Sequence, residues 1–244
     1  MVKNNIVILL AGGYGTRLYP LTYFIPKIFL PFKKKNLLEH HLHSLKNLNI
    51  SKIYINLLKK NYNYTSKITG NKSDRVKFVY ETKPWGSSRT IAKIMEKENF
   101  NNLIILYSDT LFYKNQSHIL NKLIKTSNNK SISISISRSS NQKYLISKGI
   151  VKIKKNKLIS FTEKPKMIKP KYSYFFSGIV VIPKIFRNKI LKTLKNKEKK
   201  YEIIDFAEKI FTLKKFNIKV CVSQKIPLDF GNWKDLFKNY FKIK

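Results

Sequence analysis

The 244-residue sequence contains a single cysteine, Cys221. One cysteine excludes an internal disulfide and a cysteine-rich metal site. This usage fits a reducing compartment, so we expect a cytoplasmic protein. The chain begins MVKNN and continues into a short apolar run that ends in glycines, so we expect no signal peptide.

Long apolar runs are also missing, because no stretch approaches the roughly 18 to 20 residues of a membrane span. We therefore expect no membrane partner. Acidic residues are scarce: 13 Asp and Glu stand against 50 Lys and Arg, which gives a net charge of +37. Such a charge would suit a nucleic acid or an anionic surface. The lysines are scattered along the whole chain, however, and Lys, Asn and Ile are abundant together. We attribute the charge mainly to composition and expect no specific nucleic-acid partner.

The pattern of apolar residues predicts an α/β fold. The continuous apolar run at residues 6–10 is typical of a buried parallel strand. Further strands are expected at 52–57, 76–80 and 103–107, with helices at 37–48 and 89–98. This alternation predicts a Rossmann-like open mixed sheet with helices on both faces.

The pattern of apolar and polar residues changes from Ser131 onward. The segment "SISISIS" alternates strictly, which predicts a strand with one covered face. Short strands are also expected at 149–153, 158–161 and 176–182, so this half should be richer in antiparallel pairs. No repeat, linker or boundary is visible, and we predict one domain over residues 1–244, with halves at 1–130 and 131–244. The oligomeric state stays open, a homo-oligomer included.

A glycine-rich loop, "LLAGGYGTRLYPLT", follows the first predicted strand. Gly12, Gly13 and Gly15 can expose successive backbone N–H groups, which form a cradle for phosphate oxygens. A Walker loop would end in Gly-Lys-Ser/Thr, but this loop ends Gly15-Thr16-Arg17. The sequence therefore predicts an anion-binding loop of another kind.

The dinucleotide-binding fingerprint is excluded as well. It requires a third glycine where Leu18 stands and a helix directly afterwards, whereas we expect Pro20 and Pro26 to keep the chain extended. Arg17 and Lys27 flank this segment. Because Arg clamps phosphate oxygens and Lys adds a point charge, the pair favours a polyphosphate ligand.

At this point the sequence resembles the sugar-1-phosphate nucleotidyltransferases, a branch of the nucleotide-diphospho-sugar transferase fold. The resemblance starts with "LLAGGYGTRLYPLT…IPK" and continues in order along nearly the whole chain. Its later motifs are "SDT" at 108–110, "FTEKP" at 161–165, "FSGIVVIP" at 176–183 and "LDFGNWKDL" at 228–236. It assigns residues 1–130 to the nucleotide and 131–244 to the sugar phosphate.

The resemblance implies transfer of a nucleotide from a nucleoside triphosphate to a sugar 1-phosphate, with release of pyrophosphate. The nucleotide-binding residues implied are Leu10, Ala11, Gly12, Gly13, Gly15, Thr16, Arg17, Gly86 and Ser87. Glu163, Lys164 and Gly178 are implied for the sugar phosphate. Arg17, Lys27 and Asp109 are the implied catalytic residues.

A divalent metal is part of the same implication. The attacking phosphate is already an anion, so the reaction needs charge stabilisation more than a general base. Asp109 and Asp229 supply the hard oxygen ligands that Mg²⁺ prefers, and the substrates' phosphates would complete its shell. Each aspartate could alone be a turn residue or a helix cap. Their order after the glycine loop favours the metal.

Three histidines, His40, His41 and His43, stand in one predicted helix. A metal site is one interpretation, but no other histidine lies near them in sequence. We therefore interpret them as part of a helix face.

Two departures from the family pattern leave the substrate open. Arg89 replaces a small residue after the loop that holds Gly86 and Ser87, and Ser177 stands where asparagine-alanine usually precedes Gly178. The loop wording is most similar to mannose-1-phosphate guanylyltransferases, which favours GTP and cell-envelope polysaccharide precursors. The short length is more like heptose-1-phosphate guanylyltransferases or muramate-phosphate uridylyltransferases. Uridylyl, thymidylyl or cytidylyl transfer, a non-catalytic nucleotide-sugar sensor, and a basic RNA-binding protein remain as alternatives.

Overall fold

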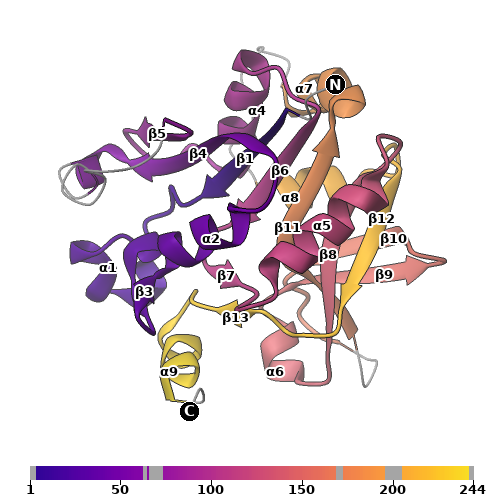
Figure 1. Ribbon diagram of the computed structural model, residues 1–244. Helices are drawn as coiled ribbons and strands as arrows, with labels where there is room; N and C mark the ends of the chain where they lie inside the picture. Colours follow the sequence, from indigo (N-terminus) through magenta and orange to yellow (C-terminus); the bar gives the residue numbers. More distant parts are fainter. Residues whose placement is uncertain (1–3, 63–64, 66–73, 169–172, 196–204, 242–244) are drawn as a thin grey trace.

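The computed structural model describes residues 4–62, 65, 74–168, 173–195 and 205–241. Its centre is a nine-stranded mixed sheet in the order β5-β4-β1-β6-β11-β8-β12-β10-β9 (Figure 1). The strands are β1 Asn5–Leu10, β4 Ile50–Leu58, β5 Val76–Glu81, β6 Asn102–Tyr107, β8 Ile132–Ser139, β9 Gly149–Lys154, β10 Lys157–Glu163, β11 Ser173–Pro183 and β12 Ile218–Ser223.

Strand direction differs between the two ends of this sheet. The pairs β1–β4, β1–β6 and β4–β5 are all parallel. Beyond β6, the pairs β6–β11, β11–β8, β12–β10 and β10–β9 are antiparallel, and β8–β12 is parallel. The predicted Rossmann-like mixed sheet, with a second half richer in antiparallel pairs, is therefore confirmed.

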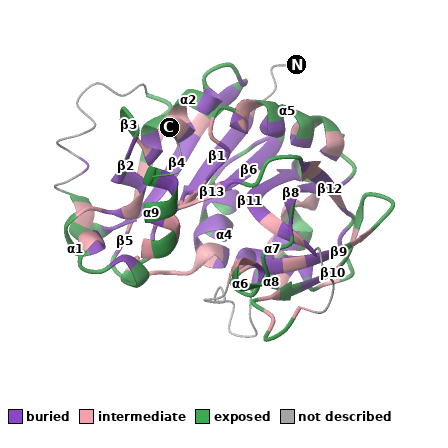
Figure 2. Cartoon of the chain, turned by 90° about the horizontal axis from the view of Figure 1, so that it is seen from below, coloured by how far each residue is buried: buried purple, intermediate pink, exposed green. Residues whose placement is uncertain are grey.

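Helices cover both faces, as predicted. Because side chains alternate along a strand, Ile6 and Ile8 pack into one core and Val7 and Leu9 into another. The first core includes residues of α4 (Ser87–Lys97), α7 (Arg187–Leu194) and α8 (Phe206–Phe211), and the second includes residues of α2 (Leu37–Leu45) and α5 (Gln116–Ser127). Figure 2 shows the buried strands between helices whose outer sides are exposed.

The prediction for "SISISIS" was wrong in one respect: both faces of β8 are covered. Ser133 and Ser135 are fully buried, like the isoleucines that alternate with them. Their hydroxyls are satisfied internally, since Ser133 donates to the carbonyl of Leu123 at 2.8 Å and Ser135 accepts from the Ile179 N–H at 3.1 Å. A serine face can thus be buried against backbone, which periodicity alone does not reveal.

The segment after the glycine loop is not extended, which corrects a second expectation. It forms three short helical turns, η1 (Thr16–Leu18), α1 (Leu21–Phe24) and η2 (Lys27–Phe29). Pro20 and Pro26 each occupy the position just before a turn, where the missing N–H costs nothing.

A separate two-stranded sheet positions the motif at residues 228–236. β7 (Thr110–Leu111) pairs with β13 (Leu228–Asp229), so Asp229 lies opposite Thr110. α9 (Trp233–Phe241) follows β13, and the Asn239 amide donates to the Asp229 carbonyl at 2.7 Å. The remaining elements are β2 Pro31–Phe32, β3 Lys35–Asn36, η3 Lys59–Asn61, α6 Gln142–Leu145 and η4 Lys184–Phe186. Within the described ranges, no helix has the length and apolar character needed to cross a membrane.

Candidate active site

Two clefts adjoin at the carboxyl ends of β1 and β6, where open α/β sheets bind ligands. The first, which we call the Gly-loop cleft, has a volume of about 270 Å³. It is lined by Leu10, Ala11, Gly12, Gly13, Gly15, Lys27, Asn56, Pro84, Gly86, Ser87, Tyr107, Ser108, Asp109 and Asp205. The second, the Glu163 cavity, has a volume of about 260 Å³ and shares Tyr107, Asp109 and Asp205 with the first.

Most residues predicted for the nucleotide line the Gly-loop cleft, but two do not. Thr16 lines neither cleft, and Arg17 lines the Glu163 cavity. Arg17 nevertheless lies close to the shared boundary. Its Nη2 and a carboxylate oxygen of Asp109 both lie within 3.7 Å of the point where a Cβ on Gly231 would sit.

A buried polar network lies beneath Gly12. Asn56 accepts from the Ala11 N–H at 2.8 Å and donates to Glu81 at 2.9 Å. A Cβ on Gly12 would stand 2.3 Å from the Asn56 Nδ2. Glycine is therefore required here by close approach, and the network fixes the backbone of the loop.

Ser87 was predicted to contact the nucleotide, but its hydroxyl already makes hydrogen bonds within the protein. Its hydroxyl donates to Asp205 at 3.0 Å and accepts from the Phe206 N–H at 2.7 Å. Asp205 also caps α8 and accepts from the Tyr107 hydroxyl at 3.0 Å. Asp205 therefore ties the start of α4 to the end of β6. Burial raises the pKa of Tyr107 well above its usual value, and Asp205 adds to that rise, so the phenol stays protonated and donates.

The two predicted metal ligands are brought together from 120 positions apart by the β7–β13 pair. An oxygen of Asp229 and one of Asp109 lie 2.8 and 3.7 Å from the same point, the Cβ position of Gly231. Backbone bonds fix both: the Gly231 N–H donates to the Asp229 carboxylate at 2.6 Å, and the Phe230 N–H to the Asp109 carbonyl at 2.8 Å.

Each of these aspartates is paired with its own lysine. Lys27 Nζ lies 3.1 Å from Asp109, and Lys148 pairs with Asp229. Burial acts to raise the pKa of Asp109, but the charge and hydrogen bond of Lys27 outweigh it and hold that pKa below its usual value. Asp109 is thus ionised across the neutral range.

The predicted sugar-phosphate residues all line the Glu163 cavity. The full lining is Arg17, Tyr107, Asp109, Thr110, Tyr144, Ser147, Lys148, Gly149, Glu163, Lys164, Phe175, Phe176, Ser177, Gly178, Asp205, Ala207, Pro227 and Asp229. Glu163 and Lys164 pair at 3.5 Å, with the Lys164 side chain 65% exposed. Burial raises the pKa of Glu163, and this outweighs the opposing effect of Lys164.

Two glycines shape this cavity. Gly178 has φ +90, in the left-handed region, and a Cβ there would press on Thr110 at 3.0 Å. Gly149 leaves room for Phe161, whose ring would stand 2.3 Å from a Cβ. Ser177 turns its hydroxyl to Ser135 at 3.0 Å, which commits that hydroxyl to an internal partner.

Arg89, the other departure from the family pattern, does not line the Gly-loop cleft. Its guanidinium lies over the Trp85 ring at 5.3 Å from the centroid, and Lys93 lies over the same ring at 3.7 Å. The side chain is therefore engaged in a cation–π contact.

Sequence reasoning missed Lys148, Asp205, Tyr107 and Asn56. Lys148 and Asn56 lie outside every motif, although Lys148 directly precedes a predicted strand and Asn56 lies within one. Tyr107 directly precedes Ser108-Asp109, so its place beside Asp109 could have been noticed. Asp205 could have been found as an acidic residue just before an apolar helical run, given how few acids the chain has.

The histidines lie on α2, as interpreted. His41 is fully buried, and burial lowers its pKa to about 4, so the ring is neutral. Its Nε2–H donates to the Ser108 carbonyl at 3.1 Å, and its Nδ1 accepts from Gln116 at 2.9 Å. His41 therefore buttresses the backbone next to Asp109.

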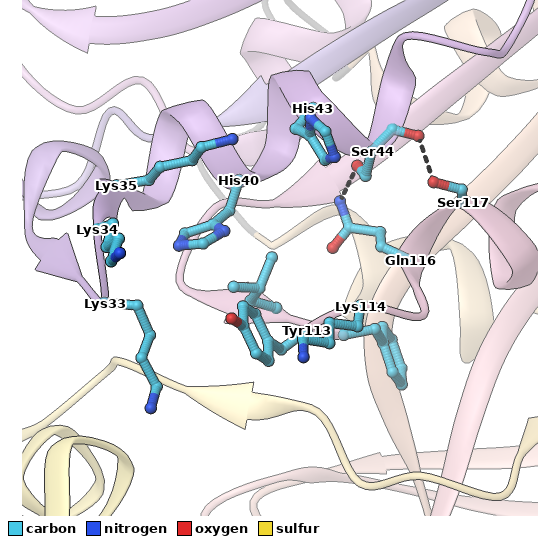
Figure 3. Close-up of a pocket in the computed structure, with 12 residues that line it drawn as sticks. Lys33, Lys34, Lys35, His40, His43, Ser44, Tyr113, Lys114, Gln116 and Ser117 are labelled. Atoms are coloured by element: carbon cyan, nitrogen blue, oxygen red, sulfur yellow. Dashed lines mark hydrogen bonds between the residues drawn. The ribbon is translucent and has the colours of Figure 1, made fainter. Parts of the chain in front are cut away.

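A larger cavity of about 600 Å³ lies between α2 and the segment after β7 (Figure 3). Its lining includes Lys33, Lys34, Lys35, Lys114, His40 and His43, but none of the predicted site residues. Cationic lining does not single it out. A hollow of about 590 Å³ elsewhere is lined by Lys122, Lys125, Lys155, Lys157 and Lys219.

Among the described residues, no group of three or more His, Cys, Asp or Glu side chains forms a metal site. The candidate donor set is therefore the pair Asp109 and Asp229. Two carboxylates that leave other positions for phosphate oxygens fit a hard cation such as Mg²⁺. They do not fit a structural zinc site, which requires four nitrogen or sulfur ligands.

Comparisons with known proteins find related sequences and structures. A family model described as nucleotidyl transferase matches residues 6–244. The bifunctional protein GlmU of Methanococcus aeolicus is 28% identical over 240 residues, 95% of this chain and 51% of that protein. A Sulfolobus acidocaldarius protein, named provisionally as a mannose-1-phosphate guanyltransferase, is 30% identical over 192 residues, 75% of this chain and 50% of that protein.

The chain thus spans about half the length of these curated relatives. Among solved structures, HddC from Yersinia pseudotuberculosis complexed with GMP-PN has a TM-score of 0.72 at 24% identity. The match covers 99% of this chain and 100% of that one. At this identity the likeness shows the shared fold.

Proposed function

The chain belongs to the nucleotidyl transferase family, and we propose that it transfers a nucleotide from a nucleoside triphosphate to a sugar 1-phosphate with release of pyrophosphate. The observation that carries the proposal is the meeting of the Gly-loop cleft and the Glu163 cavity at Asp109. Two anionic substrates repel each other in solution, but two adjoining binding sites would hold them next to each other in a geometry suited to reaction.

In this proposal the triphosphate lies in the Gly-loop cleft, with its phosphates against the backbone N–H groups of the loop. Lys27 neutralises charge near the α-phosphate, and Arg17 holds the leaving pyrophosphate from the boundary. In the Glu163 cavity, Lys164 binds the acceptor phosphate and Glu163 accepts hydrogen bonds from sugar hydroxyls. An acceptor phosphate oxygen then attacks the α-phosphorus, in line with the departing pyrophosphate.

Asp109 and Asp229 would hold a divalent cation, which we propose is Mg²⁺. When bound, such an ion supplies Lewis-acid stabilisation of charge on the phosphates. The two carboxylates supply the hard oxygen ligands for it, and the β7–β13 pair brings their two segments together.

We further propose a guanine nucleotide and mannose or heptose 1-phosphate as substrates. The wording of the glycine loop and the name of the Sulfolobus acidocaldarius relative support this choice. The test is pyrophosphate release with Mg²⁺, each of the four common nucleoside triphosphates and a panel of sugar 1-phosphates. We expect release that requires both substrates and is fastest with GTP. Release with no combination, from folded protein, would contradict the proposed activity.

A further inference from the structure

The two aspartates at the boundary carry two negative charges in a confined space, and two lysines balance them. Lys27 belongs to the segment after the glycine loop, and Lys148 directly precedes β9. The side chains of Lys148 and Asp229 are 17% and 13% exposed, so this pair is mostly withdrawn from water. Without such partners, two nearby carboxylates would repel each other strongly.

Lys148 is placed to reach the acceptor as well as Asp229. Its ammonium lies 4.7 Å from the centroid of the Tyr144 ring, and it lines the Glu163 cavity. Its carbonyl accepts from the Lys164 N–H at 3.1 Å, so the two lysines project from neighbouring backbone positions. A flexible four-carbon stem lets an ammonium change partners at little cost.

We infer that Lys148 is a phosphate-binding residue of the acceptor site that rests on Asp229 until a divalent cation takes that carboxylate. This inference rests on the proposed function. The charges balance: one divalent cation brings two positive charges to Asp109 and Asp229 and releases two ammonium groups, those of Lys27 and Lys148. Each released lysine then faces a phosphate, Lys27 on the Gly-loop side and Lys148 in the Glu163 cavity.

The exchange makes the cation a condition for binding the acceptor. While Lys148 is paired with Asp229, its charge is committed to that carboxylate and is not available to an acceptor phosphate. Once the cation is bound, the same cavity offers Lys148 and Lys164 to the acceptor phosphate. The lysine therefore opposes the cation and assists the phosphate.

These opposite effects are the test. We would measure Mn²⁺ binding alone by electron paramagnetic resonance, and inorganic phosphate binding in saturating Mg²⁺ by calorimetry. Lys148→Gln should bind Mn²⁺ about tenfold more tightly, because a charge-assisted competitor is gone, and phosphate about tenfold more weakly. A residue with a purely structural role would not move the two affinities in opposite directions.

Lys164→Gln is the matched charge control for the Mn²⁺ measurement, since it removes the same charge from the same cavity without pairing with either aspartate. It should change Mn²⁺ affinity much less than Lys148→Gln. Lys148→Arg keeps the charge and should stay within about threefold of the wild-type Mn²⁺ affinity, which separates the charge from any damage to the fold.

Unchanged or weaker Mn²⁺ binding by folded Lys148→Gln would overturn the inference, and so would an equal effect of Lys164→Gln. Unchanged phosphate binding by Lys148→Gln would do the same. Neither probe requires turnover. Failure of the pyrophosphate-release panel would therefore refute the proposed function without touching this result.

Discussion

The Gly-loop cleft and the Glu163 cavity meet at Asp109 but are built differently. The first takes five of its fourteen lining residues, Leu10 to Gly13 and Gly15, from one continuous loop, and the backbone of this loop is held by Asn56, which is bonded to Glu81. The second is lined by side chains from many segments, from Arg17 to Asp229. Recognition of phosphate by backbone can be encoded locally, whereas recognition of an acceptor depends on how distant segments pack.

The largest effects should come from the boundary that both clefts share. Asp109→Asn and Asp229→Asn should each lower pyrophosphate release by orders of magnitude, because each removes a charged ligand from the shared donor pair. Thermal unfolding should be little changed, because the Phe230 N–H bonds to the Asp109 backbone carbonyl and an asparagine at position 229 keeps a side-chain oxygen that can accept from the Gly231 N–H. A double variant with near wild-type metal-dependent turnover would exclude the two-aspartate site.

Variants of Arg17 and Lys164 test which substrate each cleft binds. Arg17 is the critical case, because it was predicted for the nucleotide but lines the Glu163 cavity. Arg17→Ala should raise the KM for the triphosphate, and Lys164→Ala the KM for the sugar phosphate. Each charge-assisted contact is worth about 1.5 to 3 kcal/mol, or about 10- to 100-fold. Steady-state kinetics with each substrate varied in turn separates the two. If Arg17→Ala raised only the acceptor KM, Arg17 would belong to the Glu163 cavity.

Two glycine-to-alanine variants perturb the two clefts in the same way, one in each cleft. Gly12→Ala must displace Asn56, and Gly149→Ala must displace the ring of Phe161. Each should cost about 1 to 3 kcal/mol of unfolding free energy, the first raising the triphosphate KM and the second the acceptor KM. Gly13→Ala is the stability control, because a Cβ there meets nothing within 4 Å. Equal losses in all three, measured by chemical denaturation, would show that close approach is not the cause.

The smallest expected effect is a difference in acid sensitivity. The pKa of Asp109 is lowered, whereas that of Glu163 is raised by burial, so Glu163 takes up a proton first as the pH falls. Protonated Glu163 accepts sugar hydroxyls less well, so the acceptor KM should rise severalfold at a pH where the triphosphate KM is still flat.

Monophosphate esters titrate near about pH 6 themselves, which requires a control. Glu163→Gln should remove only the protein's contribution to the acceptor profile. Identical pH profiles of the acceptor KM in wild type and Glu163→Gln would show that Glu163 does not titrate in this range.

The strands and helices of the parallel half could be predicted from the sequence, because the pattern of apolar residues within each segment indicates its secondary structure. The run at 6–10 matches β1 within one residue, and the helix expected at 89–98 is α4 at Ser87–Lys97. The helix expected at 37–48 ends at Leu45, since its last residues turn toward β4. The buried serines of β8 could not be read, because their burial depends on partners elsewhere in the fold. The helical turns after the glycine loop are closed by local bonds, such as that from the Leu18 N–H to the Gly15 carbonyl. They were missed because a proline that ends a helix can also precede one.

The residues of the candidate site also fall into two groups, those that the sequence predicted and those that only the fold brings together. The glycine loop and the aspartate motifs were visible as contiguous strings. Lys148 was not, because its significance arises only when β13 brings Asp229 to it from 81 positions away. Asp205 likewise gains its place through the hydroxyls of Tyr107 and Ser87, which no spacing rule connects.

The central claim is that an acceptor in the Glu163 cavity takes the α-phosphate of a nucleotide in the Gly-loop cleft. The most direct measurement follows triphosphate labelled at the α- or the γ-phosphate, incubated with Mg²⁺ and the best acceptor from the panel. The account predicts that the α-label enters a nucleotide-diphospho-sugar and the γ-label enters pyrophosphate, with both transfers lost in Asp109→Asn. Recovery of the α-label only in free nucleotide, or label transfer that survives Asp109→Asn, would contradict it.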